Sequence, residues 1–567
     1  MKINIRNIIP WGVITALLLS MGACQDMLET DSNRVAFEED NALNNPDAPF
    51  YVISGILREL QKIGDNYVIM GELRGDLMNT SDLASVSLKE INDFQVSKDN
   101  EYLDQRNYYN VINHCNYAIQ KMDTSIFIAN EKVMIPAYAM IKSIRAWTYM
   151  QLGLIYGSAI YVEEPILSLE SSLTQYPTVS MDNLFDLLED DLLPYINVRE
   201  PAYNIAPARF VPVKAILGDI YLYQGRYEDA ALMYYRLMDP LEGNYTLIND
   251  SYAYRWTNSN ANGVWYTSTH GYFGEAIAGI QYSDDPKDFH SALVGLTYNG
   301  RASLLPTSSF VDFMTMAVHF HQNSPTVSTV SIMEGDLRGT VYSKFFNLPV
   351  AYEYITFKNT VERVPLISKF HRYETMSASG TDPNNNLIEG GLSYLTWVAL
   401  LRNVHVYLRY AEAVNRAGKP SLAFAVLKYG LKNATLSNSL MVNQAELANG
   451  EMYVNFEHTT FDGNVGTASR GRGLGVSAIN NAYQIPDFTE SPTAKQDSIN
   501  WVEDRILEEM AAETAFEGNR FFDLLRVSKR RDNHPAFMAE KVARKYGNPD
   551  VMKTRLASDI NAWFVKP

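Results

Sequence analysis

The residues EEMAAETAFEGNRFFDLLR, numbered 508–526, form the most informative stretch of this 567-residue chain. Its apolar side chains recur near the period of an α-helix, and its alanines favour that conformation. The residues concerned are Ile506, Met510, Phe516 and Leu524, with Ala511, Ala512 and Ala515 between them. We therefore predict a helix that runs through the whole stretch.

The charged residues of the same stretch predict a network of ion pairs. Glu509, Glu513 and Glu517 recur every fourth residue, so on one helix they would share a face. Like charges one turn apart repel each other, so an isolated helix would not favour them. We expect Arg520 and cations from elsewhere in the fold to compensate these carboxylates in buried ion pairs. Gly518 costs about 1 kcal/mol relative to alanine inside a helix, which indicates that another backbone passes close to it.

The stretch resembles the C-terminal signature of the SusD/RagB family, outer-membrane nutrient-binding lipoproteins of Bacteroidetes-type bacteria. The family pattern is roughly E-R-x-x-E-x-x-F-E-G-x-R-x-x-D-L-x-R. The matching residues are Glu509, Glu513, Phe516, Glu517, Gly518, Arg520, Asp523, Leu524 and Arg526. Met510 departs from the pattern, because the family usually has arginine there. The resemblance implies a scaffold of tetratricopeptide-like helix pairs that binds nutrients without transforming them.

Glu513 and Glu517 invite a second interpretation as the acid pair of a glycosidase, which needs two carboxylates flanking the scissile bond. Such pairs normally come from different strands or loops that reach into a cleft. These two lie one helical turn apart beside their own arginine, so the structural interpretation is favoured. We predict that the stretch holds the C-terminal helix against its neighbours through ion pairs and that it contains no catalytic residue.

The composition argues against nucleic acid as a partner. The chain has a formal net charge of −17 and a pI near 5.1, whereas nucleic acid requires a basic surface. Its only compact basic run, 529–531, follows the signature stretch, where cations suit the C-terminal end of a helix. Aromatic residues make up 12% of the chain. Most should pack in the core, and the rest suit a surface that stacks on sugar rings or peptides.

Residues 1–23 form a predicted signal peptide. Two cations precede an apolar run that is too short to span a bilayer, and small residues follow it. Cys24 comes directly after these small residues, which resembles a bacterial lipobox and implies that Cys24 becomes the lipidated first residue. Removing the leader takes the net charge from −17 to −19, and lipidation of Cys24 would leave Cys115 without a disulfide partner.

Three segments predict the helical scaffold. Residues 136–156 form one amphipathic helix, residues 211–237 form two helices hinged at Gly225, and residues 404–431 form two more hinged at Gly418. Helix, glycine turn and helix is the unit of tetratricopeptide repeats. Because the copies lie far apart in the sequence, we predict that they do not form a continuous solenoid.

Long segments of a different composition separate these helices. Residues 240–400 and 435–500 are rich in Asn, Gly, Ser, Thr and Tyr and show little helical period. Loops this long are usually functional or disordered, and their aromatic content argues against simple disorder. We therefore predict a mostly α protein with an N-terminal region of helical repeats, 24–239, and a C-terminal region, 240–567, that carries irregular ligand-binding loops.

Two stretches offer the mixture of aromatic, amide and arginine side chains that recognises sugars or peptides. One follows the turn Glu72-Leu73-Arg74-Gly75-Asp76, and the other lies in the first long excursion. The predicted ligand-binding residues are Asn79, Asp82, Phe94, Trp265, Tyr266, Tyr272, Tyr298 and Arg301. For each residue alone, core packing is the competing interpretation, but a Trp/Tyr cluster within an Asn/Gly/Ser-rich loop fits a binding surface better.

No sequence motif points to enzymatic chemistry. The chain shows no nucleophile elbow, zinc-binding HExxH helix or phosphate-binding P-loop. We predict no cofactor and no metal site, and leave structural calcium in the acidic loops open.

The resemblance implies a lipid-anchored protein of the cell outer membrane that faces the extracellular side. It would capture an oligosaccharide and pass it to a SusC-like TonB-dependent β-barrel. The same scaffold binding oligopeptides, as in the RagB branch, is the first alternative. A surface glycoside hydrolase is the second.

Overall fold

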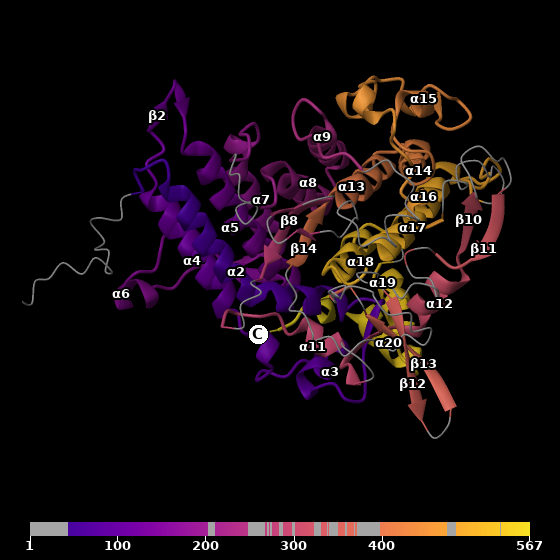
Figure 1. The fold of residues 1–567 in the computed structure, drawn as a ribbon, viewed down its shortest axis with the longest axis horizontal. Helices are drawn as coiled ribbons and strands as arrows, with labels where there is room; N and C mark the ends of the chain where they lie inside the picture. The colour runs from indigo at the N-terminus through magenta and orange to yellow at the C-terminus, as the bar shows by residue number, and fades with distance from the viewer. Residues whose placement is uncertain are drawn as a thin grey trace, which may run out of the picture.

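A computed structural model shows a body of packed helices with short strand pairs at several places around and across it (Figure 1). The residues that it describes are 43–566 apart from 202–209, 248–266, 269–270, 273–274, 283–286, 298–300, 323–329, 337, 339–349, 358–359, 368, 371–396, 473–482 and 533. The predicted mostly α-helical scaffold is confirmed. Within the described ranges, every helix is too short or too polar to cross a lipid bilayer. The boundary expected between residues 239 and 240 stays a prediction.

The scaffold is a row of helices in which each packs against the next. In order along the row they are α2 (Ala48–Glu72), α4 (Arg106–Lys121), α5 (Ile135–Tyr156), α7 (Met181–Leu192), α8 (Val213–Gln224), α9 (Tyr227–Met238), α13 (Asn403–Arg416), α14 (Pro420–Lys428) and α17 (Ala494–Thr514). Helices α9 and α13 are direct neighbours although the first long excursion separates them in sequence. The prediction of a discontinuous stack is therefore wrong, because the chain leaves the row and returns to the same place.

Glycines in the left-handed region end helices where the sequence predicts turns. Gly157 follows α5 with φ +77°, Gly225 follows α8 with φ +77°, and Gly418 lies just after α13 with φ +87°. A residue with a Cβ atom is strained at such φ values, which is why glycine stands there. The turns allow α8 to pack against α9 and α13 against α14. Both predicted helix pairs are confirmed.

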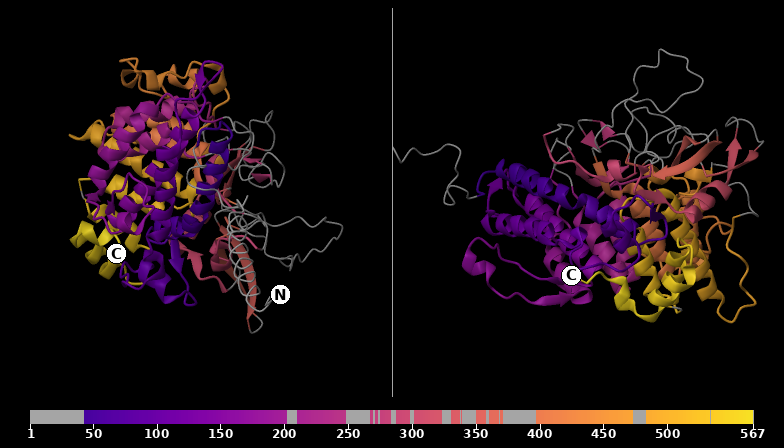
Figure 2. Two further views of the ribbon diagram at one scale, coloured as in Figure 1. Left: turned by 90° about the vertical axis from the view of Figure 1, so that its left-hand side faces the viewer. Right: turned by 90° about the horizontal axis from the view of Figure 1, so that it is seen from below.

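The first excursion contains paired strands, where the sequence predicted irregular loops. Strand β8 (Ala276–Gln281) pairs antiparallel with β14 (Trp397–Arg402), and β14 leads directly into α13. The other pairs are β1 (Met78–Thr80) with β9 (Leu304–Pro306), β2 (Phe127–Ile128) with β3 (Glu131–Lys132), β4 (Ser158–Ile160) with β5 (Thr178–Ser180), β6 (Thr267–Ser268) with β7 (Gly271–Tyr272), β10 (Val318–Gln322) with β11 (Val330–Glu334), and β12 (Val350–Phe357) with β13 (Thr360–Ile367). Strands β8 to β14 lie along one side of the helical body (Figure 2, right). Among these pairs, only β1 with β9 and β8 with β14 join segments far apart in sequence, and nothing local in the sequence specifies those partners.

Shorter helices complete the fold. They are α3 (Val86–Asn92), α6 (Leu169–Ser172), α11 (Leu293–Thr297), α12 (Ser308–Met316), α15 (Asn433–Leu436), α16 (Ser469–Arg472), α18 (Arg520–Ser528), α19 (Ala536–Ala543) and α20 (Pro549–Ser558), with the final 3₁₀ turn η11 (Ile560–Trp563). The C-terminal helices α18 to α20 lie beside the N-terminal α2 and α3, so the two ends of the described chain share one region (Figure 1).

The signature stretch is not one helix, contrary to the prediction. Helix α17 ends at Thr514, and a turn with left-handed Phe516 (φ +66°) and Gly518 (φ +88°) separates it from α18. The Glu72 carboxylate, at the end of α2, accepts hydrogen bonds from the backbone N–H groups of Phe516 at 3.0 Å and Gly518 at 2.8 Å. It also accepts from Asn519 at 3.0 Å and from Arg520 at 3.3 Å. A buried carboxylate that satisfies four free donors outweighs the local preference for a continuous helix.

The close backbone approach expected at Gly518 is confirmed. A Cβ atom on Gly71 would lie 1.8 Å from the Gly518 carbonyl oxygen. A Cβ atom on Gly518 would lie 2.5 Å from the Tyr67 ring. Helix α2 therefore touches the signature turn through two glycines and the Glu72 carboxylate.

Candidate functional site

The three glutamates of the signature lie in buried ion pairs, and their partners come from the two excursions and from the end of β14. Arg338 contacts Glu509 at 2.7 Å, and Arg470 contacts Glu513 at 2.8 Å. Arg402, at the end of β14, binds Glu517 at 2.8 Å. All of these side chains are at most 4% exposed. Glu517 stands in the turn after α17, so the three carboxylates do not form a ladder on one helix.

The cations set the protonation of Glu517. Burial alone would raise its carboxyl pKa, but the charges of Arg402 and Lys369 hold the pKa down to about 2. Lys369 contacts Glu517 at 2.5 Å, and burial lowers the pKa of this lysine to about 8. Burial raises the pKa of Glu513, and the charges of Arg470 and Arg338 oppose that rise. Because Glu513 and Glu517 are enclosed by protein cations, they do not face a cleft as a glycosidase acid pair would.

Arg520 does not compensate the signature glutamates, contrary to expectation. Its Nε donates to Asp76 Oδ1 at 2.6 Å and its Nη2 to Asp76 Oδ2 at 2.9 Å, while Nη1 donates to the Leu507 carbonyl at 2.8 Å. Arg526 binds Glu412 of α13 at 2.6 Å and Asp523 at 2.8 Å. The expected position of residues 529–531 at the end of the signature helix is confirmed, because Lys529 is the C-cap of α18. Arg531 also pairs with Glu503 and Asp504 of α17. The signature thus ties α2, α13, α17 and α18 together.

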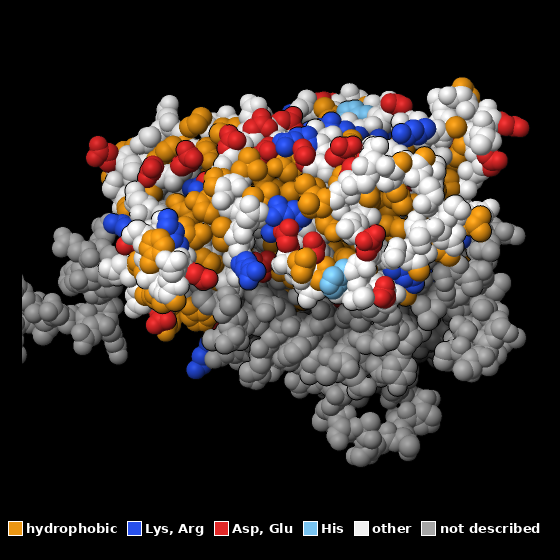
Figure 3. Space-filling model, turned by 90° about the horizontal axis from the view of Figure 1, so that it is seen from above, with side chains coloured by type: hydrophobic (Ala, Val, Ile, Leu, Met, Phe, Trp, Pro, Cys, Tyr) orange, Lys and Arg blue, Asp and Glu red, His pale blue; other side chains and the backbone are white. Residues whose placement is uncertain are grey.

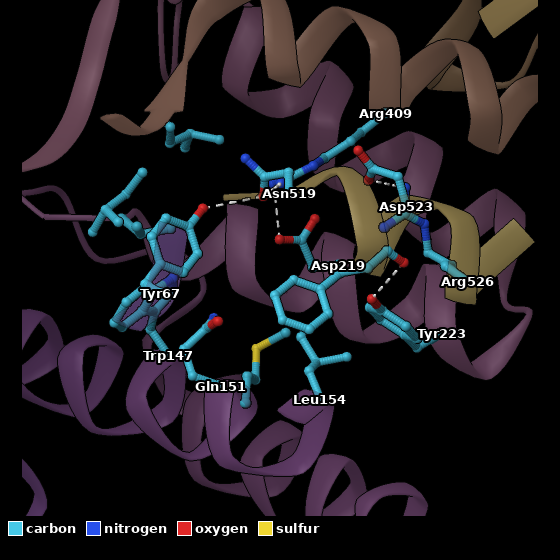
Figure 4. A pocket seen from close by; sticks show the side chains of 15 residues that line it. Tyr67, Trp147, Gln151, Leu154, Asp219, Tyr223, Arg409, Asn519, Asp523 and Arg526 are labelled. Carbon is cyan, nitrogen blue, oxygen red and sulfur yellow. Dashed lines mark hydrogen bonds and ion pairs between the residues drawn. The ribbon is translucent and has the colours of Figure 1, made fainter. Parts of the chain in front are cut away.

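A small cavity lies behind the signature turn, among α2, α5, α8 and α13 (Figure 4). Its volume is about 40 Å³. Asn519 Oδ1 accepts from the Tyr67 hydroxyl at 3.2 Å and from Arg409 at 3.3 Å, and Arg409 binds Asp219 at 2.8 Å. A polar space of this size suits ordered water and is too small for a sugar.

Two of the predicted ligand-binding stretches meet at the pair of strands β1 and β9. Thr80 is paired with Leu304, and Ser81 donates its N–H to the Ser303 carbonyl at 2.9 Å and its hydroxyl to the Ala302 carbonyl at 2.7 Å. Asp82 and Arg301, which follow and precede these contacts, are both exposed. The structure therefore brings two predicted ligand-binding residues, distant in sequence, to one edge of the molecule.

The same edge exposes two apolar residues that the sequence prediction missed. Leu83 is 62% exposed and Val86 is 74% exposed. Ser85 caps α3 by accepting the Leu88 N–H, which turns Val86 outward in the first turn of that helix. The Ser85 cap could have located the helix start in the sequence, but not the exposure of Val86. We name Asp82, Leu83, Val86 and Arg301 the β1–β9 edge.

Asn79 and Phe94 face the scaffold more than the solvent. The Asn79 side chain donates to the Lys545 carbonyl at 3.2 Å and is half-buried. Phe94, with φ +55°, is half-buried beside Phe521, with 6.0 Å between the ring centroids. Phe94 also lines a cleft of about 260 Å³ between residues 91–96 and residues 561–566.

The structure does not describe the side chains of the remaining residues that the sequence predicts to bind lipid or ligand. Cys24, Trp265, Tyr266 and Tyr298 lie outside the described residues. Tyr272 belongs to β7, but its side chain is not described. Their assignments as lipid-attachment and ligand-binding residues stay predictions.

Solved structures share this fold across most of the chain. A SusD superfamily protein from Bacteroides vulgatus ATCC 8482 has a TM-score of 0.59 and 15% identity over 92% of this chain and 95% of that one. A SusD-like carbohydrate binding protein from Bacteroides fragilis NCTC 9343 has a TM-score of 0.54 and 15% identity, with 86% of each chain covered. Surface glycan-binding protein A from Bacteroides fluxus has a TM-score of 0.52 and 14% identity, with 88% of this chain and 91% of that one covered.

The sequence matches no protein-family model and no curated protein. The structural likeness nevertheless shows that the chain has the SusD fold, as the signature stretch predicts.

Proposed function

We propose that this protein is a lipid-anchored outer-membrane protein that binds oligosaccharide nutrients at the cell surface. It delivers them to a SusC-like TonB-dependent β-barrel. The observation that carries the proposal is the SusD fold, which a structure described as a carbohydrate binding protein shares over 86% of the chain and one described as a glycan-binding protein over 88%. The β1–β9 edge offers a carboxylate, a guanidinium and two exposed apolar side chains at one place, which suits the hydroxyls and faces of a sugar.

Binding to glycans is tested by isothermal titration of residues 25–567 against glycan and peptide libraries. We expect heat from at least one oligosaccharide and a weaker response in the double variant Asp82→Ala/Arg301→Ala. Both positions are exposed, so this variant should retain the wild-type melting temperature. Binding to peptides alone would instead favour the oligopeptide alternative.

The proposed role is binding without catalysis. The signature carboxylates are sequestered in ion pairs, which removes the most evident acid pair from any substrate. Incubation of the purified protein with candidate polysaccharides should release no reducing ends. Reproducible release that survives repurification would overturn this part of the proposal.

Anchoring through Cys24 is tested by cell fractionation. The Cys24→Ala variant should appear in the soluble fraction, because it lacks the thiol that carries the lipid. Cys115→Ala is the matched control, since the Cys115 thiol is buried in α4 and unavailable for lipidation. Membrane retention of Cys24→Ala would refute the lipoprotein assignment.

Exposed apolar side chains on the β2–β3 hairpin and around α6 support a protein partner. Phe127 and Ile128, at the tip of the β2–β3 hairpin, are 59% and 50% exposed. Leu169 and Leu173, at α6, are 78% and 74% exposed, and both elements project from the helical body (Figure 1). On the face seen from above, acidic and basic side chains are interspersed among apolar ones (Figure 3). Apolar projections of this kind suit contact with another protein.

The partner is tested by affinity purification from the native membrane. We expect a TonB-dependent β-barrel to co-purify with the wild-type protein. The yield should fall for Phe127→Asp/Ile128→Asp but not for Leu440→Asp, a control at a 92% exposed residue near α15. Equal recovery with all three proteins would remove the hairpin from the interface.

A further inference from the structure

Arg74 is a buried cation for which the described part of the chain supplies no carboxylate partner within ion-pair distance. Only 1% of its surface is exposed, and it lies at the turn that ends α2. Its Nη2 donates to the Trp563 carbonyl, whereas Nε and Nη1 have no hydrogen-bond partner among the described residues. The two nearest acids in sequence have other partners: Asp76 pairs with Arg520, and Glu72 accepts four backbone N–H groups of the signature turn. Burying an unpaired charge is costly, and proteins tend to retain such a group where it has a function.

Aromatic rings and a second buried cation, Lys545, lie around Arg74, and the carboxylates of Asp76 and Asp93 act electrostatically on that lysine. The guanidinium carbon of Arg74 lies 3.8 Å from the Phe521 ring centroid and 5.8 Å from the Phe94 ring centroid. Lys545 is also buried and donates a hydrogen bond to the Leu73 carbonyl. Burial is the main cause that lowers the pKa of Lys545, and repulsion from Arg74 lowers it further. Burial lowers the pKa of Arg74 to about 9, so the guanidinium keeps its charge at neutral pH.

Arg74 lines the cleft of about 260 Å³ between residues 91–96 and residues 561–566. The half-buried rings of Phe94 and Phe564 form apolar walls, and the exposed Lys566 adds a second cation at the rim. Phe94 has φ +55°, a conformation that an aromatic residue seldom adopts without a structural or functional reason. We name this space the Arg74 cleft. Its volume lies below the usual range for drug-sized ligands, so it suits one sugar residue or one terminal group.

We propose that the Arg74 cleft binds the negatively charged group of an acidic sugar, with Arg74 contacting the anion and Phe94 and Phe564 contacting the sugar ring. A guanidinium with three free N–H groups, one on Nε and two on Nη1, is suited to the oxygens of a carboxylate or a sulfate ester. The proposal rests on the glycan-binding function above and narrows it to glycans that carry uronate or sulfate.

The test measures binding of sodium glucuronate, glucose 6-sulfate and neutral methyl glucoside to residues 25–567 by ligand-observed NMR at low salt. We expect the two anions to bind more tightly than methyl glucoside. In Arg74→Met, whose apolar side chain fits the space between the rings, affinity for the anions should fall more than about tenfold. Arg106→Met, at an arginine whose side chain is 86% exposed, is the matched control and should bind as the wild type does.

A second variant keeps the test decisive if Arg74→Met does not fold. Lys566→Glu changes an exposed residue and should fold normally. It should weaken anion binding roughly two- to fivefold, as expected for one exposed charge. Response to only one of the two anions would identify the carboxylate or the sulfate ester as the group recognised.

Equal anion affinity in the wild type, Arg74→Met and Lys566→Glu would overturn the proposal, because the anion would then bind elsewhere. Failure of both anions to bind, while neutral oligosaccharides bind, would overturn it and leave the proposed glycan-binding function intact. Absence of binding to every glycan, charged or neutral, would overturn the proposed function itself.

Discussion

Substitution of Arg520 by methionine isolates the energetic role of the signature turn. In the wild type, Arg520 makes a two-point contact with Asp76 through Nε at 2.6 Å and Nη2 at 2.9 Å. The Asp76 side chain is 14% exposed and the Arg520 side chain 7%. Methionine fills much of the same volume and removes the charge, so Asp76 is left buried without its cation.

The expected cost follows from this geometry. Removing one partner of a buried ion pair typically destabilises a protein by about 3–5 kcal/mol. With an unfolding entropy of about 2.1 cal/mol/K per residue, roughly 540 residues give about 1.1 kcal/mol/K, so the melting temperature should fall by roughly 3–5 °C. Burial alone would raise the pKa of Asp76, but the Arg520 charge and hydrogen bonds hold it below its usual value. The stabilisation is therefore present above the pKa of an unfolded aspartate and is lost as pH falls through the lower folded pKa. The deficit of the variant should accordingly shrink in acid.

Calorimetric melting of residues 25–567 at neutral and acidic pH provides the measurement. Arg106→Met is the matched control, because Arg106 contacts Asp104 at 2.6 Å with 86% of its side chain exposed. An exposed pair contributes at most about 1 kcal/mol, so this control should melt within about 1 °C of the wild type.

A double-mutant cycle with Asp76→Asn assigns the effect to the pair. The double variant Arg520→Met/Asp76→Asn should recover part of the loss, because no buried charge is left unpaired. The reasoning is refuted if Arg520→Met costs no more than Arg106→Met. It also fails if the two substitutions at the buried pair are simply additive.

Two further predictions concern helix α2 and the C-terminal region. Gly71→Ala should destabilise the protein by about 3 kcal/mol or more, because the new Cβ would overlap the Gly518 carbonyl. Gly55→Ala in the same helix is the control: its Cβ would meet no atom within 4 Å, so it should stabilise the protein by about 0.5–1 kcal/mol. Equal melting temperatures of the two variants would contradict the close approach of Gly71 to Gly518. Lys545→Met should raise stability most at and below pH 7, because burial lowers the folded pKa of Lys545 to about 7 while the unfolded chain stays protonated to about pH 10.5. Wild-type stability therefore rises between these pH values, so melting curves at pH 6, 8 and 10 should show that the stability gained by Lys545→Met shrinks as pH rises. A gain in stability that is independent of pH would show that this lysine is not buried as described.

The local features of the fold follow from the sequence, because they depend on residues that are neighbours along the chain. Glycine turns at Gly225 and Gly418 predicted two helix pairs, and the signature stretch predicted the SusD fold. The buried charge of Glu509 and Glu513 was also foreseeable, since like charges at helical spacing require partners. What these patterns lacked was the identity of the partners.

Tertiary structure alone decided those partners, because they come from segments distant in sequence. Glu72 breaks the predicted C-terminal helix by accepting four backbone N–H groups, although it precedes them by more than 440 residues. Arg520 pairs with Asp76, and the strands β1 and β9 bring Asp82 beside Arg301. The sequence identified the turn that contains Arg74. The lack of a partner for its guanidinium is apparent only in the structure, where α18, residues 91–96 and the C-terminal segment surround it. The periodicity of the sequence indicates which residues are buried. The partner of each buried charge depends on the tertiary packing, which brings distant segments together.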